Sequence, residues 1–401
     1  MKKLLAAVLA LTLAAPACAT PFTDTSPQTN VETVVAQTMQ ALTSVASPAP
    51  IATSAPPSGT SNLLPHPLYY LNNDSTGFLQ VYRLETDGKT VQQITFEPSN
   101  VETYDISPVD GSVAYTSNNQ LLLMEADGSN RLLLVDGGPL GSDESYIYNR
   151  VSTVAWSPDG KTIAFGHGGL NFYALDTGAI NKVLENQVDN SPGIAILREG
   201  YSPREYTPDG SKLLINIGYY EGGVYALYYL SGNTLVRSEE NAVTCCEGSW
   251  TPDGSAYYAA SPYLGMISPG LWRITADGKV DTLLDGEFPG PVEFAQAPIL
   301  GPDGQLYFFH YSMPQAENLT NRVPLYMVRS GTDGVTGRTN LYPEPFEGIN
   351  EILWAPDASF AVLATAPVEN IFQGGKAEIY YTDGSPSVSL VPFAQDMRWG
   401  P

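Results

Sequence analysis

Short apolar, strand-like runs alternate with polar turns along most of the chain, from about residue 67 to the C-terminus. Examples of the runs are Thr162–Phe165, Leu213–Ile217 and Leu306–Phe309, and Ala276-Asp277-Gly278 is a typical turn. The 401 residues include 37 Gly, 32 Pro and 24 Tyr. Many short apolar runs separated by Gly and Pro turns predict an all-β domain.

One short motif recurs along this domain at a nearly fixed spacing. Its six copies begin at Ser107, Ser157, Thr207, Thr251, Gly301 and Ala355. Four read Pro-Asp-Gly after the first residue, whereas the first copy carries an inserted Val109 and the last has Ala358 in place of Gly. The six Asp residues lie 49, 50, 44, 50 and 54 positions apart. A repeat of about 45–50 residues indicates the blades of a β-propeller.

The motif itself has the chemistry of a tight turn. Pro presets φ, Asp accepts hydrogen bonds from nearby backbone N–H groups, and Gly adopts the left-handed conformation that closes a hairpin. We therefore expect each repeated Asp to serve its own turn rather than a metal or a reaction. Trp156, Trp250 and Trp354 directly precede their motifs, and we expect these rings to pack between neighbouring blades.

Each repeat reads as strand A, motif, strand B, strand C, a polar turn and strand D. Residues 67–95 supply strands B, C and D without a strand A, whereas the final residues, Met397 to Pro401, resemble a strand A. We therefore predict that the C-terminal strand completes the N-terminal blade and closes the ring. The count is then seven blades, with six or eight as the alternatives, over residues 66–401.

A family resemblance rests on the stretch Val154–Phe165, which reads VAWSPDGKTIAF. It resembles the propeller repeat of TolB and of prolyl-oligopeptidase relatives. The resemblance implies a propeller and says little about activity. The TolB family carries an additional N-terminal α/β domain and six blades. This chain has a different N-terminal segment and seven predicted blades, so the envelope role of the TolB family is not carried over to it.

The N-terminus has the features of an export signal. Lys2 and Lys3 precede the apolar stretch Leu4–Ala15, which is too short to span a bilayer. The following Ala15-Pro16-Ala17-Cys18 resembles a lipobox, although a lipobox usually has Leu where Ala15 stands. Residues 1–18 therefore predict a signal peptide with lipidation at Cys18, giving a membrane-anchored lipoprotein at the cell surface or in the periplasm. The alternative is ordinary cleavage and secretion.

Residues 19–65 are rich in Ser, Thr, Ala and Pro and predict a disordered tether. Within them, Val31–Val45 could form a short helix, as part of the spacer or as a partner-binding element. The formal net charge of −23 argues against nucleic-acid binding. We expect a monomer.

Strand order in a propeller places the D–A and B–C loops on one face. The long loops fall there, among them the D–A loops near residues 136–151, 186–203, 239–247 and 285–297. Exposed loops on a rigid scaffold commonly bind ligands. The candidate binding residues on this face are Tyr146, Tyr148, Arg150, Tyr201, Arg204, Tyr219, Tyr220, Glu221, Glu247, Tyr263, His310, Tyr311 and Glu351. They suit a glycan, a peptide or a protein surface. Alternatively, the Tyr-rich loops merely cover the face.

Strand A of each blade lines the central channel of a propeller. Its polar residues form either a ligand site or a structural network with water. These residues include Arg204, Glu205, Glu247, Asn350, Glu351, Asp396 and Arg398. The adjacent Cys245 and Cys246 form either a vicinal disulfide or a reduced pair. With three His in the chain and no ligand spacing among them, we expect no metal and no cofactor.

These features favour a binding module for an envelope protein, a peptide or a glycan. A prolyl-oligopeptidase-type enzyme needs a Gly-x-Ser-x-Gly motif, which the sequence lacks. A carboxylate-based, glycan-active enzyme is the second hypothesis, because acidic residues such as Glu205 and Glu247 could converge. A structural scaffold is the third.

Overall fold

The computed structural model describes residues 62–191, 194–219, 222–238, 248–263, 268–287, 290–314, 323–367 and 373–401. The chain divides into two compact units, Met1–Gly59 and Thr60–Pro401, and the following concerns the second. The predicted signal peptide, Cys18 and the tether up to residue 61 lie outside the described residues. No helix among the described residues is long and apolar enough to cross a membrane.

Nearly all regular structure in the second unit is antiparallel β-sheet. One sheet has the order β25(Ile349–Trp354), β26(Phe360–Thr365), β27(Gly375–Tyr381), β28(Val388–Trp399), β1(Leu68–Asn73), β2(Leu79–Leu84), β3(Val91–Gln93). The next two contain β4(Val101–Ile106), β5(Val113–Ser117), β6(Gln120–Met124), β7(Leu132–Asp136), and then β8(Val151–Trp156), β9(Thr162–His167), β10(Gly169–Ala174), β11(Ile180–Glu185).

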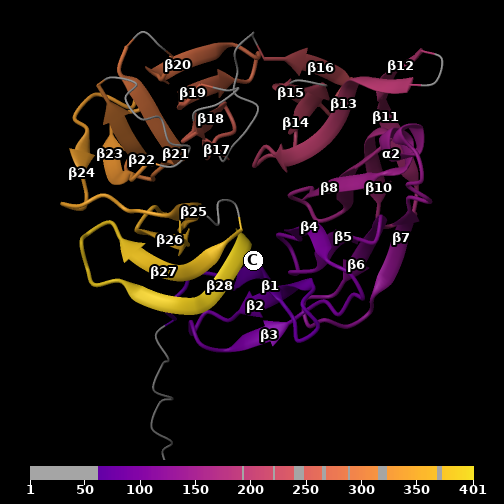
Figure 1. The fold of residues 1–401 in the computed structure, drawn as a ribbon, viewed down its shortest axis with the longest axis horizontal. Helices are drawn as coiled ribbons and strands as arrows, with labels where there is room; N and C mark the ends of the chain where they lie inside the picture. Colours follow the sequence, from indigo (N-terminus) through magenta and orange to yellow (C-terminus); the bar gives the residue numbers. More distant parts are fainter. Residues whose placement is uncertain are drawn as a thin grey trace, which may run out of the picture. The chain divides into compact units, whose positions relative to one another are not determined.

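The other three sheets follow the same meander. They contain β12(Gln187–Ser191), β13(Ile194–Tyr206), β14(Lys212–Tyr219), β15(Gly222–Tyr229), β16(Thr234–Arg237), then β17(Gly248–Trp250), β18(Ala256–Ser261), β19(Gly270–Thr275), β20(Val280–Asp285), and finally β21(Val292–Leu300), β22(Leu306–Met313), β23(Tyr326–Ser330), β24(Thr339–Asn340). Within this unit the sheets follow one another around a central axis, as in a β-propeller (Figure 1). The predicted all-β propeller architecture is confirmed.

The repeated motifs form the hairpins between the inner strand of each sheet and the next strand. In one of them, the hydroxyl of Ser157 donates to Asp159 at 2.6 Å, the backbone N–H of Lys161 donates to the same oxygen at 3.1 Å, and Gly160 has φ +68°. Asp209 and Asp253 accept equivalent bonds from their own turns. The structural interpretation of these Asp residues is confirmed.

The Trp residues before the motifs pack against the preceding sheet, as predicted. Trp156 lies in a buried cluster with Ala114 and Leu121 of the sheet before it. The indole N–H of Trp354 donates to the carbonyl of Ala297 in β21 at 2.6 Å. Each ring thus connects neighbouring sheets through apolar contact, and Trp354 adds a buried hydrogen bond.

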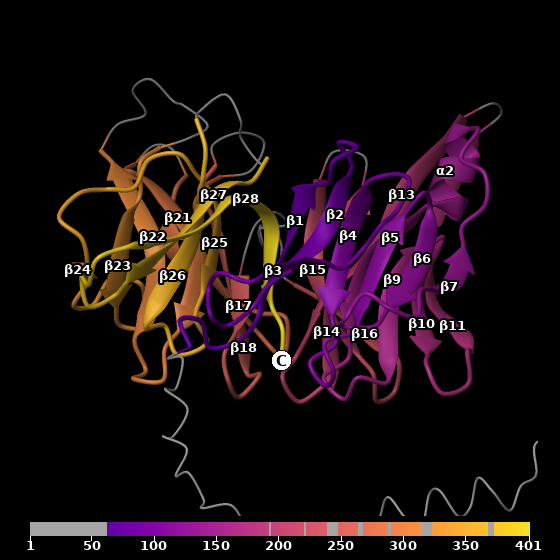
Figure 2. The same ribbon diagram turned by 90° about the horizontal axis from the view of Figure 1, so that it is seen from below.

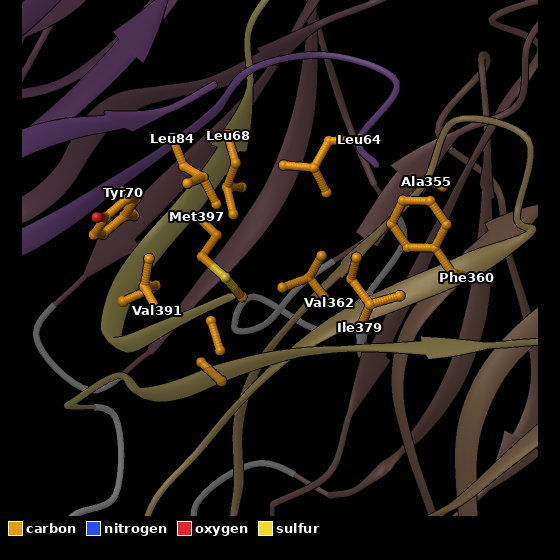
Figure 3. Packing of buried hydrophobic residues seen from close by; sticks show 13 residues of the cluster. Leu64, Leu68, Tyr70, Leu84, Ala355, Phe360, Val362, Ile379, Val391 and Met397 are labelled. Atoms are coloured by element: carbon orange, nitrogen blue, oxygen red, sulfur yellow. The ribbon is translucent and has the colours of Figure 1, made fainter. Parts of the chain in front are cut away.

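The last strand pairs with the first. The early part of β28 pairs with β27, with Val391 opposite Ala377, and its end pairs with β1, with Trp399 opposite Leu68. Figure 3 shows the core around this joint, where Leu68 and Tyr70 of β1 pack in one cluster with Val362, Ile379 and Met397. The C-terminal residues therefore belong to the sheet that begins at Leu68.

Two segments expected as loops contain regular structure. Residues 136–151 include helix α2(Asp143–Asn149), which begins with a capping box between Ser142 and Ser145. In the segment 186–203, β12 pairs with the first half of β13, with Asp189 opposite Ile196, so the loop is a β-hairpin extension. Figure 2 shows α2 at one rim of the unit and the C-terminal residue at the opposite rim.

Candidate functional site

A central cavity of about 980 Å³ lies among the inner strands of the sheets. Its walls come mainly from β4, β8, β13, β25 and β28. Among the described residues, five acidic and two basic side chains line it: Glu102, Asp105, Glu205, Glu351, Asp396, Arg204 and Arg398. The cavity therefore has an acidic wall and a volume within the range of small-ligand sites.

Backbone bulges shape the inner strands beside this cavity. Thr153 in β8, Ala297 in β21 and Asp396 in β28 have φ values of +36°, +49° and +50°. Thr153 and Ala297 lie four positions before the first residue of their motifs, and Asp396 lies four positions before Gly400, the equivalent position at the C-terminus. The strand register shifts at each of these three residues. A bulge bends a strand and redirects its side chains, so the same distortion recurs where the strands meet the cavity.

Arg398 is held in the cavity wall by two carboxylates. Its guanidinium lies 3.5 Å from Asp105 and 3.3 Å from Asp396, and it stacks 5.4 Å from the ring of Tyr104. Burial alone lowers the pKa of Arg398, but Asp396 and Asp105 raise it above its usual range, so Arg398 stays charged. Asp105 also accepts a 2.7 Å hydrogen bond from the backbone N–H of Trp156.

Glu351 fastens β25 to β28. Its two carboxylate oxygens accept hydrogen bonds from the backbone N–H groups of Asp396 at 2.8 Å and Met397 at 3.1 Å. The phenol of Tyr104 donates to the carbonyl of Asp396 from the other side. Burial raises the pKa of Glu351 to about 7, against the effect of the two N–H donors. Glu351 therefore has a structural task at the bulge of β28.

Glu205 has no comparable task. Its side chain is exposed to the cavity space, and none of the described residues makes a hydrogen bond or an ion pair with its carboxylate. Enclosure by the cavity walls raises the pKa of Glu205 to about 7, and Arg204 opposes this shift. The neighbouring Arg204 lies over the ring of Tyr225 at 5.4 Å. Glu205 is thus a carboxylate on the wall of an open cavity with no fixed partner among the described residues.

The cavity wall also has buried polar atoms without partners. Among the described side chains, the indole N–H of Trp156, the hydroxyls of Tyr206 and Thr153, and the Nε of Arg398 make no hydrogen bond. All four residues line the cavity. Such atoms are costly unless water or a ligand satisfies them.

Some of the predicted binding residues line the cavity, and others lie on α2 or have partners elsewhere in the sheets. Arg204, Tyr263 and Glu351 line the cavity. Tyr146 and Tyr148 lie on α2, and Arg150 stacks over Tyr146 at 4.9 Å. Arg150 also pairs with Glu102 at the cavity wall at 3.3 Å, so α2 is connected to the cavity through this ion pair.

Tyr201, His310 and Tyr311 have internal partners. The ring of Tyr201 is buried, and its hydroxyl donates to Glu199 at 2.6 Å. His310 is buried with its Nε2 against the carboxylate of Glu293 at 2.5 Å, and Tyr311 packs on Phe294. Tyr219 is exposed. Tyr220, Glu221, Cys245, Cys246 and Glu247 lie outside the described residues.

The sequence interpretation missed Asp105 on the cavity wall and Tyr104, whose ring contacts Arg398. Asp105 lies two positions before its motif, the position that Glu205 occupies before its own motif and Arg398 before the C-terminal counterpart. Alignment of the inner strands on the motif was therefore the signal that could have found it. Among the described residues, no group of three His, Cys, Asp or Glu side chains is placed to hold a metal ion.

No protein-family model and no curated protein matches the sequence. Solved structures do match. Oligogalacturonate lyase from Vibrio parahaemolyticus is 14% identical, with a TM-score of 0.52, and the match covers 82% of this chain and 87% of that one. A prolyl endopeptidase is 11% identical, with a TM-score of 0.51, over 84% of this chain and 51% of that one, so this chain spans about half its length.

TolB from Acinetobacter baumannii is 16% identical over 83% of this chain and 82% of that one, with a TM-score of 0.41. At such identities the matches concern the fold. The chain folds as a β-propeller of the type present in prolyl endopeptidases and oligogalacturonate lyase.

Proposed function

We propose that this chain is an exported β-propeller that acts as a binding module and takes a protein, peptide or glycan ligand into its central cavity. The observation that carries the proposal is the cavity of about 980 Å³, whose wall includes Glu205, a carboxylate with no partner among the described residues. Pockets with a few convergent polar groups are the usual binding sites of such folds. The ligand enters from the face opposite the motif hairpins, where α2 lies.

The proposal includes a ring of seven blades. The support is a series of buried clusters, each of which links one group of strands to the next. The series begins between β1–β2 and β4–β6 and continues to β25–β26. One further cluster links β25–β28 to β1 and β2. In this count the end of β28 is the inner strand of the blade formed with β1, β2 and β3. A closed ring leaves no open sheet edge between the first and last blades.

Export and anchoring are also part of the proposal, and they rest on the sequence of residues 1–18. Lipidation at Cys18 would make the membrane a partner of the protein. Metabolic labelling with a radioactive fatty acid tests this step. Label is expected in the native chain and not in a Cys18→Ser variant, whereas unlabelled native chain would indicate the secreted alternative.

A carboxylate-based, glycan-active enzyme is the second candidate. It is favoured by the presence of Glu205 and Glu351 on one cavity wall, each with its pKa raised to about 7. The two backbone N–H groups that Glu351 holds favour a structural task for that residue. Release of reducing ends from glycans, lost on Glu205→Gln substitution, would support the enzyme over the binding module.

The binding function is tested by blocking the cavity. Leu353 lines it, so Leu353→Trp should fill part of the space, whereas Leu133→Trp on exposed β7 is a matched control. We expect the native chain and the Leu133→Trp variant to bind at least one member of a glycan and peptide array saturably. The Leu353→Trp variant should bind it at least tenfold more weakly. Equal binding by all three proteins would contradict the cavity as the site.

A further inference from the structure

We propose that the cavity recognises a cationic group of its ligand, a primary ammonium or a guanidinium, and that the carboxylate of Glu205 is its partner. This inference rests on the proposed binding function and deepens it by naming the ligand chemistry. It starts from the described part of the cavity wall, where acidic side chains outnumber basic ones.

Most charges on this wall already have partners. Arg398 is shared by Asp105 and Asp396. Glu351 accepts two backbone N–H groups, and Glu102 pairs with Arg150. What remains is the carboxylate of Glu205, with no ion pair or hydrogen bond among the described residues.

The surroundings of Glu205 favour a bound organic cation. Ionised carboxylates away from bulk water need a counter-charge. Arg204 is adjacent in sequence, but its guanidinium lies over the ring of Tyr225. The negative charge of Asp105 in β4 further disfavours the ionised form of Glu205. A ligand cation would supply the counter-charge that Glu205 needs, and it would also offset the repulsion between Glu205 and Asp105.

Two residues of the same wall carry buried donor atoms. Among the described side chains, the hydroxyl of Tyr206 and the indole N–H of Trp156 make no hydrogen bond, and both residues are more than nine-tenths buried. Both line the cavity that contains Glu205. The cavity is far larger than a single metal ion, which again favours an organic cation.

Binding should depend on pH in a defined direction. The charged and titratable groups around Glu205 are Arg204 beside it, Asp105 in β4, Arg398 in β28, Tyr257 on the cavity wall and Tyr225, whose ring contacts Arg204. Because the pKa of Glu205 is about 7, part of the population is protonated at neutral pH. A cation binds the ionised form, so affinity should rise with pH through 7, and binding near pH 6 should release protons.

The test is isothermal titration calorimetry of the full chain at physiological salt. Pentalysine serves as the peptide source of the cation and spermidine as the free polyamine. Pentalysine acetylated on every side-chain amine is the neutral control. We expect saturable binding of at least one of the two cations, at least tenfold weaker binding of the acetylated peptide, and a proton release that varies with the buffer. The cation that binds identifies the source.

Matched variants separate the cavity from the acidic surface. Glu205→Gln and Asp176→Asn each remove one negative charge, and Asp176 is exposed in a turn after β10. Glu205→Gln should weaken binding at least tenfold, whereas Asp176→Asn should leave it unchanged. Glu205→Asp, which keeps the charge but withdraws it, should give an intermediate loss, and thermal melting of each variant establishes that it is folded.

Three results would overturn the inference. Equal weakening by Glu205→Gln and Asp176→Asn would mean general attraction to an acidic surface. No binding of either cation, together with a neutral ligand that Leu353→Trp excludes, would refute the cationic class and leave the binding function standing. If Leu353→Trp excludes no ligand of any class, both the inference and the binding function fail.

Discussion

The carboxylates of the cavity differ in how the cost of their burial is offset. Asp105 and Asp396 each pair with Arg398, so its positive charge offsets their negative charges. Glu205 and Glu351 line the same cavity, and enclosure raises the pKa of each to about 7. Glu351 offsets part of this cost by accepting two backbone N–H groups, but Glu205 has no such compensation among the described residues. Glu205 is therefore where function and stability are expected to conflict.

The first prediction concerns the pH dependence of stability at Glu205. The folded-state pKa is about 7, above the usual value of 4.5. Between these pH values the folded state holds more protons than the unfolded state, so stability falls as pH rises through this window. Glu205→Gln mimics the protonated form. It should match the native chain near pH 4.5 and exceed it at pH 8 by about 1 kcal/mol, a figure reduced for screening by water in the cavity.

Urea unfolding followed by Trp fluorescence at both pH values measures this difference. Asp176→Asn, on the exposed turn, serves as the control and should shift stability little at either pH. If Glu205→Gln changed stability equally at pH 4.5 and pH 8, the carboxylate would not be titrating in this window.

Residues with a local task were the ones that the sequence could identify. The Asp of each motif bonds to its own turn, so its neighbours in the sequence are enough to predict it. Asp105 and Glu205 come from strands about 100 residues apart, and nothing local to either reveals their shared cavity. The positive φ of Thr153 and Ala297 was also unpredictable, because such residues rarely adopt it and only the surrounding sheet imposes it.

At the scale of elements, one ion pair connects the segment after β3 to the next sheet. Glu97 is buried, and its carboxylate pairs with Nε of Arg131 at 2.7 Å and with its Nη2 at 3.0 Å. The hydroxyl of Tyr115 in β5 donates to Glu97 at 2.8 Å. Burial alone raises the pKa of Glu97, but the bonds from Arg131 and Tyr115 lower it below its usual range. The ionised form is thus the form that the fold uses.

The second prediction is that Glu97→Gln destabilises the protein by about 2 kcal/mol, because it breaks a bidentate pair and leaves Tyr115 with a weaker acceptor. Since the folded pKa is depressed, this stabilisation is present above the unfolded pKa and is lost as pH falls through the folded value. Denaturant unfolding at pH 7 and pH 3.5 measures both effects. Lys376→Gln is the control, because it breaks the more exposed ion pair with Glu378 and should cost less than about 1 kcal/mol. If Glu97→Gln cost no more than Lys376→Gln, the burial of Glu97 would contribute nothing to stability.

Elements far from the repeat were the least predictable. The strands follow from the apolar runs and the motif spacing, and their order was predicted correctly. In contrast, the segment 186–203 was expected as a loop because it lies between strands D and A of successive blades. It contains Ser191-Pro192-Gly193, a turn signal between two strand-length segments. The hairpin of β12 and β13 forms there because the two segments pair with each other.

At the scale of the whole molecule, stability is distributed over sheets that contact chiefly their neighbours. Most buried clusters join two successive sheets, and the cluster around Leu68, Val362 and Met397 joins β25–β28 to β1 and β2 within one sheet. The proposed ring depends on this joint between β28 and β1, because without it apolar strand faces and a strand edge are exposed. The residues that complete this joint are at the extreme C-terminus.

The third prediction is that a chain ending at Gln395 loses this joint. It lacks the part of β28 with Arg398 opposite Tyr69 and Trp399 opposite Leu68. It also lacks the indole of Trp399, which donates to the carbonyl of Trp354 at 2.7 Å. Burial of Met397 in the joint is lost as well. The combined loss of unfolding free energy should exceed about 4 kcal/mol, since deletion of one large buried side chain alone costs about 2–5 kcal/mol. The thermal midpoint should fall by roughly 10 °C or more.

A chain ending at Trp399 is the matched control for this truncation. It loses only Gly400 and Pro401, and with them one hydrogen bond from the N–H of Gly400 to the carbonyl of Pro67 at 2.8 Å. The thermal midpoint of this control should fall by only a few degrees, because one such bond contributes about 1 kcal/mol. Differential scanning calorimetry of the two chains beside the native one separates the cases. If the chain ending at Gln395 melted like the control, the terminal strand would be an attachment to an already stable open array of sheets, and the closed ring of seven blades would have to be abandoned.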